Sequence, residues 1–167
     1  MGLFNWNKKK KEADNPPPAY DAGQMQAIFI RDMSANAERL VQAFNPRFNG
    51  MFDYSSDSLL LLDKLLGEFA KYSAKADPRL TQDMVAQAGS YLFEVARRKY
   101  GGVYVWFAER HQPVLITGMP DFQISILAFE KVKDRLENGE EDSLPVFFQL
   151  YAQKVESAKP GDKSTVV

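Results

Sequence analysis

The chain of 167 residues contains no cysteine and only one histidine. The absence of cysteine excludes disulfide bonds, thiolate zinc sites, iron–sulfur ligation and a cysteine nucleophile. It fits a reducing compartment, and the cytoplasm is the expected location. No stretch approaches the roughly 18 apolar residues of a membrane span, and the N-terminus lacks the apolar core of a signal peptide.

Sequence motifs of the common catalytic and ligand-binding sites are also missing. There is no GxxxxGKS/T or GxGxxG phosphate loop, no GxSxG nucleophile elbow, no HExxH pair and no EF-hand loop. His111 lies beside Arg110 and Gln112 in a polar stretch that is typical of an exposed turn. A metal ligand or a base would need an orienting partner, and the sequence places none. We therefore predict no cofactor and favour a non-enzymatic protein over an enzyme.

Charge is nearly balanced over the chain, with a formal net of −1, but it is unevenly placed. Residues 1–15 hold the lysine run Lys8–Lys11 against only Glu12 and Asp14. The rest of the chain is therefore mildly acidic. Because binding to nucleic acid needs a basic face for the phosphates, a nucleic-acid partner is not expected.

The distribution of proline, lysine and apolar residues divides the chain into one domain and two tails. Residues 1–22 carry the lysine run and three consecutive prolines without apolar periodicity, so they are expected to be disordered. Residues 23–157 form the domain, and residues 158–167 are expected to be a second disordered tail. The segment Leu3–Lys11, where apolar residues adjoin the lysines, could instead contact an anionic membrane surface weakly.

Apolar periodicity predicts the secondary structure of the domain. Stripes at i, i+3 and i+4 spacing indicate helices, whereas the β-branched and aromatic run after Gly101-Gly102 indicates strands. The expected elements are a helix over 23–44, a helix after Ser58, a helix from Pro78 to Gly101, strands over 103–107, 113–117 and 122–126, a helix over 128–137 and a last helix after Ser143. This order predicts an α+β fold that is mostly helical, with three N-terminal helices, a short three-stranded antiparallel meander and two C-terminal helices.

A polar patch on the third expected helix lies away from its apolar stripe. Its residues Glu94 and Arg98 are spaced i, i+4 with the acid first, which is the favourable orientation for a surface ion pair. A solvated face is the favoured interpretation, because runs of charge are usually exposed. The alternative is a polar cleft between this patch and the strands that follow. The candidate partner- or ligand-binding residues are Glu94, Arg97, Arg98, Tyr104, Trp106 and His111.

The strand over 103–107 is apolar on both sides, and its orientation stays open. If Val103, Val105 and Phe107 point inward, Tyr104 and Trp106 face outward together and would form an interface anchor. The opposite register would bury both aromatic residues in the core.

Several short motifs between residues 50 and 150 follow one another in the chain. They read DYSSDSL at Asp53–Leu59, AGSYLFEVARR at Ala88–Arg98, GG before Trp106, and RLENGEEDSL at Arg135–Leu144. This arrangement resembles a widespread family of small uncharacterised bacterial proteins with the pattern DYSxxSL…GAYLGEVxRR…GGxW…RLxNGxEDSL. The chain departs from that pattern at Phe93, where a glycine is usual. The resemblance implies no established activity, but small cytosolic proteins of this kind are often toxin-neutralising immunity proteins.

Three functions are consistent with these features. The first, which we favour, is a non-enzymatic protein-binding module, most concretely an immunity or adaptor protein with a protein partner. The second is a small-ligand-binding domain or an enzyme with a polar cleft on the third helix. The third is a membrane-peripheral protein anchored by its N-terminus. The missing catalytic motifs, the acidic core and the surplus of aromatic residues favour the first function.

Overall fold

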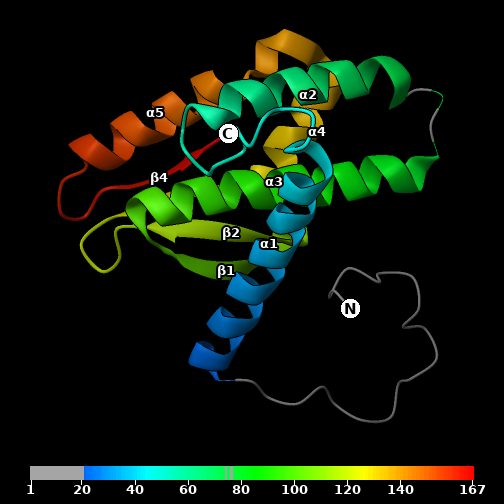
Figure 1. Cartoon of the computed structure of the whole chain (residues 1–167). Coiled ribbons are helices and arrows are strands. Elements are labelled where there is room, and N and C mark those ends of the chain that lie inside the picture. Colours follow the sequence, from blue (N-terminus) through cyan, green and yellow to red (C-terminus); the bar gives the residue numbers. More distant parts are fainter. Residues whose placement is uncertain (1–20, 74, 76) are drawn as a thin grey trace.

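The computed structural model describes residues 21–73, 75 and 77–167, which fold into helices packed on one sheet. The expected membrane-contact segment Leu3–Lys11 lies outside the described residues. No helix in the described part is long and apolar enough to cross a membrane. In chain order the elements are α1 (Ala22–Phe44), α2 (Ser58–Ser73), α3 (Pro78–Tyr100), β1 (Val103–Phe107), β2 (Gln112–Thr117), β3 (Gln123–Ile126), α4 (Ala128–Asn138), α5 (Leu144–Ser157) and β4 (Lys163–Val166), with short 3-10 turns at Ala108–Arg110 and Gly139–Asp142 (Figure 1).

The α+β class is confirmed, and two of the helices begin at recognisable caps. The side chain of Asp21 accepts the N–H of Gln24 at 2.8 Å, while the Gln24 side chain accepts the N–H of Asp21 at 3.0 Å. This capping box satisfies two backbone donors at the start of α1. α3 starts at Asp77-Pro78 and stops at Gly101, whose φ of 72° lies in the region that favours glycine.

The four strands form one mixed sheet in the order β1-β2-β3-β4, which corrects the expected three-stranded antiparallel meander. β1 pairs with β2, and β2 with β3, in antiparallel register, whereas β4 pairs with β3 in parallel. β4 also corrects the expectation of a disordered tail over 158–167. This strand escapes prediction because Val166 is its only buried residue, at 4 % exposure, and because its partner strand is distant in the sequence.

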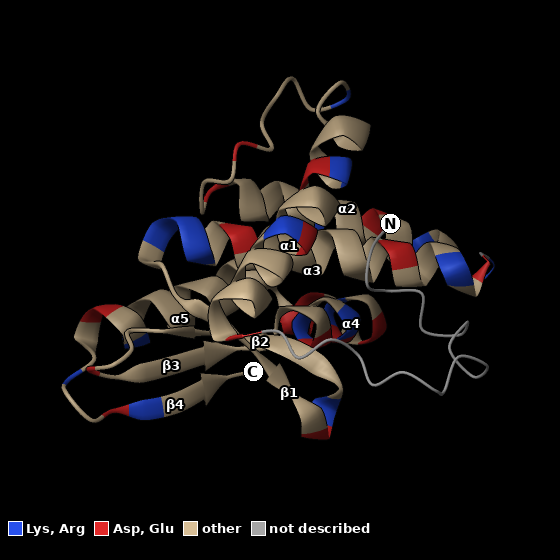
Figure 2. Ribbon diagram, turned by 90° about the horizontal axis from the view of Figure 1, so that it is seen from below, with Lys and Arg blue, Asp and Glu red and all other residues tan. Residues whose placement is uncertain are grey.

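The bodies of the helices lie on one side of the sheet, and the first turns of α1 extend past the edge strand β1 (Figure 1). Figure 2 shows the same molecule turned by 90° about the horizontal axis, so that it is seen from below. The register aligns one residue from each strand on the side of the helices, and all four are buried in the main core. These residues are Tyr104, Leu115, Ile126 and Val166.

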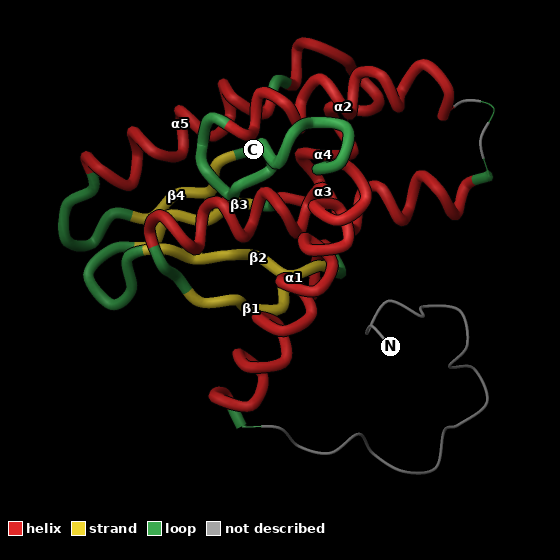
Figure 3. Tube along the Cα trace, in the orientation of Figure 1, coloured by secondary structure: helices red, strands yellow, loops and turns green. Residues whose placement is uncertain are grey.

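The third helix, α3, is the centre of the packing, because every residue from Ala88 to Ala96 is buried. α1 crosses it (Figure 3). α4 approaches it closely at Gly89, where a Cβ atom would lie 2.2 Å from Cδ1 of Phe129. The ring of Phe93, the residue that departs from the family pattern, is fully buried and lies edge-on to the rings of Tyr104 and Phe129. Phe93 therefore fills the junction of α3, α4 and the sheet.

Candidate functional site

The carboxylate of Glu94 is the centre of a buried polar cluster. Its side chain is 0 % exposed, so the expected solvated face is wrong for this residue. Arg97 donates to it in a bidentate manner, with Nε 2.8 Å from Oε1 and Nη2 2.9 Å from Oε2. Three further donors complete the shell: Arg98 Nε at 3.3 Å, Ser34 Oγ at 3.2 Å and the Tyr104 hydroxyl at 3.4 Å. The cluster joins α1, α3 and β1.

The electrostatics of this cluster favour a charged Glu94. Burial raises the pKa of its carboxyl, but the hydrogen bonds and the charge of Arg97, with help from Arg98 and Ser34, outweigh burial and hold the pKa below its ordinary value. The pKa of Tyr104 is raised by burial and by the adjacent Glu94, so its hydroxyl stays protonated and can donate. Both oxygens of Glu94 are engaged by donors within the protein. A general base needs a free lone pair directed at a substrate, and Glu94 has no such arrangement.

Arg98 extends the cluster to the loop that precedes α2. Its guanidinium lies 3.5 Å from the centroid of the Tyr54 ring, a cation–π contact. Tyr54 has a φ of 63°, and its ring stacks on that of Tyr91 with centroids 4.8 Å apart. The Tyr91 hydroxyl accepts the N–H of Tyr54 at 2.9 Å and shares a hydrogen bond of 2.7 Å with Ser58 Oγ. The DYSSDSL motif therefore holds a loop against α3.

A second polar cluster connects α2, α4 and the start of α5. Arg135 donates Nε and Nη2 to the carboxylate of Asp63 at 2.9 and 3.0 Å, and the N–H of Leu144 donates to the same carboxylate at 2.9 Å. Lys131 on α4 forms an ion pair with Asp142. These pairs account for Arg135 and Asp142 of the RLENGEEDSL motif. This cluster has no signature in the sequence, because a pairing across 72 residues leaves no local pattern.

Trp106 lies on the same side of β1 as Tyr104, yet the two residues differ in burial. Tyr104 is 1 % exposed, whereas Trp106 is 43 % exposed, because it lies toward the end of the hairpin and beyond the main core. Each of the two orientations considered for this strand is therefore only partly correct. Tyr104 is buried, as the second orientation expected, and Trp106 is exposed, as the first expected. Trp106 stands opposite Pro113 in the ladder.

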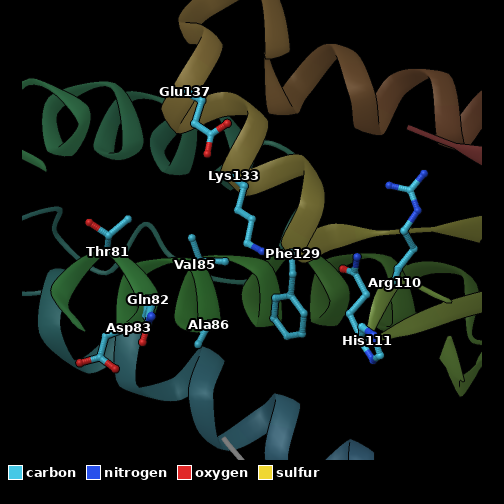
Figure 4. A pocket seen from close by; sticks show the side chains of 11 residues that line it. Thr81, Gln82, Asp83, Val85, Ala86, Arg110, His111, Phe129, Lys133 and Glu137 are labelled. Atoms are coloured by element: carbon cyan, nitrogen blue, oxygen red, sulfur yellow. The ribbon is translucent and has the colours of Figure 1, made fainter. Parts of the chain in front are cut away.

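A groove of about 650 Å³ opens at the same end of the hairpin. His111, with a φ of 50°, lines it together with Arg110 and Gln112 of the turn. Lys133 and Phe129 project into it from α4, toward α3 (Figure 4). The remaining lining residues are Thr81, Gln82, Asp83, Val85 and Ala86 of α3 and Glu137 of α4.

The six candidate residues thus separate into three groups. Glu94, Arg97, Arg98 and the hydroxyl of Tyr104 come together, but in a buried cluster that does not line the groove. His111 lines the groove, and Trp106 is exposed on the neighbouring strand. The described residues include no group of three or more acidic, histidine or cysteine side chains arranged to hold a metal ion.

Comparison of the chain with protein-family models finds no match. Comparisons with curated proteins and with solved structures also find no significant match. The resemblance to the bacterial family therefore stays a prediction.

Proposed function

We propose that the protein is a non-enzymatic protein-binding module that docks its partner at the free end of the β1–β2 hairpin. The observation that carries this proposal is the exposed indole of Trp106, 43 % exposed, beside a turn that lines the groove. Tryptophan and arginine are the residues most enriched among those that dominate binding energy at interfaces. Trp106 and Arg110 together supply both at one place.

The polar cluster around Glu94 supports this proposal because its groups bind one another within the protein. Glu94 is fully buried and is paired with Arg97 and with the partly exposed Arg98, so these contacts stabilise the domain that carries the hairpin. Arg110 is itself held by an ion pair with Glu130 of 2.6 Å, which fixes the turn before a partner arrives. A fixed surface loses less conformational entropy on binding than a loose one. The role of an immunity or adaptor protein is the specific form of this proposal that the family resemblance suggests.

The test is affinity purification of the tagged protein from the cell that produces it, with quantitative mass spectrometry. We expect one protein at near-stoichiometric yield, and we expect Trp106→Ala to lose it. Tyr72→Ala is the matched control, because Tyr72 is an aromatic residue of α2 that is 72 % exposed. Capture that survives Trp106→Ala, or that is lost equally in both variants, would contradict docking at the hairpin.

A second candidate function is the binding of a small molecule in the groove. The observation that favours it is the combination of an apolar floor, Val85 and Phe129, with charged side chains, Lys133 and Glu137, in a concavity of about 650 Å³. Native mass spectrometry of the purified protein distinguishes this function from the first. A retained small molecule that is displaced by Lys133→Glu, in the absence of a protein partner, would replace the docking proposal.

A further inference from the structure

The β1–β2 hairpin is apolar on both of its faces. Tyr104 and Leu115 face the helices, so the alternating residues of the same strands face away from them. In the ladder Val103 pairs with Ile116, and Val105 pairs with Val114. We call these residues and Phe107 the outer sheet patch: Val103, Val105, Phe107, Val114 and Ile116.

This patch does not belong to the core. Val114 is only 8 % exposed but lies outside the main core cluster, and Val105 is 42 % exposed. The corresponding outward positions of the other two strands are polar: Gln123, Ser125, Lys163 and Thr165. Antiparallel strands that face solvent on one side normally alternate apolar and polar residues, whereas strands apolar on both faces are typical of sheets covered on both sides. The composition of the outer sheet patch is therefore typical of a sheet face that packs against other residues.

The cover must come onto the face of the hairpin and not onto its edge. The side chain of Gln26 on α1 accepts the N–H of Tyr104 at 2.9 Å and donates to the carbonyl oxygen of the same residue. These are the backbone groups that an added strand would pair with at the middle of β1. Helix α1 thus occupies this edge, and its first turns extend past β1 (Figure 1).

We infer that the outer sheet patch is the docking site of the N-terminal segment Leu3–Trp6 of the same chain. This segment lies outside the described residues and holds three large apolar side chains, Leu3, Phe4 and Trp6. The described chain enters α1 at Asp21, five residues before Gln26, which is hydrogen-bonded to the edge of β1 next to the patch. Residues 7–20 separate Trp6 from Asp21, and this linker can span about 45 Å when extended.

The length of the linker makes this contact accessible without rearrangement of the domain. β1 has five residues and spans about 17 Å, which is well within reach. Intramolecular attachment raises the effective concentration of the segment into the millimolar range, so that even a weak apolar contact is populated. The patch itself carries no charged residue, and Lys8–Lys11 belong to residues 7–20 and not to the proposed docking segment.

The chain contains two tryptophans, which allows a direct test in the full-length protein. Trp106→Phe leaves Trp6 as the only indole. We expect its fluorescence to be blue-shifted and protected from iodide quenching. Adding Val105→Asp should shift the emission to the red and raise the quenching several-fold. Thr165→Asp, which places the same charge at a polar outward position on β4, should leave Trp6 unchanged and serves as the matched control.

Three outcomes would overturn this inference. The first is that Trp6 is already fully accessible to iodide in the Trp106→Phe parent. The second is that Val105→Asp and Thr165→Asp act alike. The third is sedimentation of the parent as a dimer that Val105→Asp dissociates while Trp6 stays exposed, since a second copy would then cover the patch. If Val105→Asp does not fold, Leu3→Ser with Phe4→Ser replaces it, and it should expose Trp6 by the same amount.

Discussion

At the residue scale, the main finding is that Glu94 and its arginines stabilise the fold. The sequence correctly placed Glu94 and Arg98 at i, i+4, and their ion pair is present at 3.3 Å. It missed the burial of Glu94, because apolar periodicity marks one packed stripe and α3 is packed on several sides at once. The stronger partner, Arg97, is spaced i, i+3 from Glu94 and was among the candidate residues. The approach of α1 and β1, which brings Ser34 and Tyr104 to the carboxylate, has no signature in the sequence.

The substitution Glu94→Gln tests this structural role. It keeps the shape of the side chain but removes the charge that Arg97 pairs with. Because Arg97 keeps 25 % of its side chain in solvent, we expect a loss of about 1–3 kcal/mol in the free energy of unfolding, less than for a fully buried pair. Urea denaturation measures it. Glu140→Gln, at an exposed position, is the control and should stay within about 0.5 kcal/mol of the unchanged protein.

The pH dependence of stability offers an independent test of the same residue. The pKa of Glu94 is lower in the folded protein than its ordinary value of 4.5, so the carboxylate contributes stability above that value. This contribution is lost as the pH falls below 4.5 and through the folded pKa. The difference in unfolding free energy between the unchanged protein and Glu94→Gln should therefore be constant near neutral pH and shrink in acid. A difference that grows in acid would contradict the assignment.

At the scale of elements, the sequence predicted the helices better than the sheet. Helices of 23 residues, such as α1 and α3, repeat their apolar stripe several times and begin at recognisable caps. β4 has four residues, and its register depends on parallel pairing with β3 after two intervening helices. Such a short strand has no apolar pattern of its own, which is why its segment was expected to be a disordered tail.

The close approach of α3 and α4 depends on the absence of a side chain at Gly89. Gly89→Ala would place a Cβ atom 2.2 Å from the Phe129 ring and 3.2 Å from its backbone Cα, so we expect destabilisation of about 1–3 kcal/mol. A double-mutant cycle in urea with Phe129→Ala checks the cause. If the clash is responsible, Gly89→Ala should cost much less when the ring is absent. Equal costs in both backgrounds would point to another origin.

The integration of β4 in the sheet can be tested at its buried residue. Val166→Asp places a charge in the core beside Ile126, and we expect a loss of about 2–4 kcal/mol. Thr165→Asp, one residue earlier and exposed, should be nearly neutral. Thermal unfolding followed by circular dichroism compares the two. If both variants melt like the unchanged protein, residues 163–166 do not contribute to the sheet.

At the scale of the whole molecule, the helices cover one face of the sheet, and our two proposals concern surfaces outside the main core. One is the free end of the hairpin with Trp106 and the groove, and the other is the outer sheet patch. The sequence singled out Trp106 as an aromatic residue of a strand and His111 as the one histidine, and the structure places both near the turn end of the hairpin. The groove could not be predicted from the sequence, because it forms between α3, α4 and the turn, which are distant in sequence.

The affinity of the co-purified partner for two variants tests the central claim most directly. Isothermal titration calorimetry, below the melting temperature of both variants, would compare Trp106→Ala with Glu94→Gln. We expect Trp106→Ala to weaken binding by at least tenfold, an energy of about 1.4 kcal/mol, while Glu94→Gln binds like the unchanged protein. The reverse result, with binding lost in Glu94→Gln and kept in Trp106→Ala, would contradict the assignment of Glu94 to the stability of the domain and of Trp106 to the docking surface.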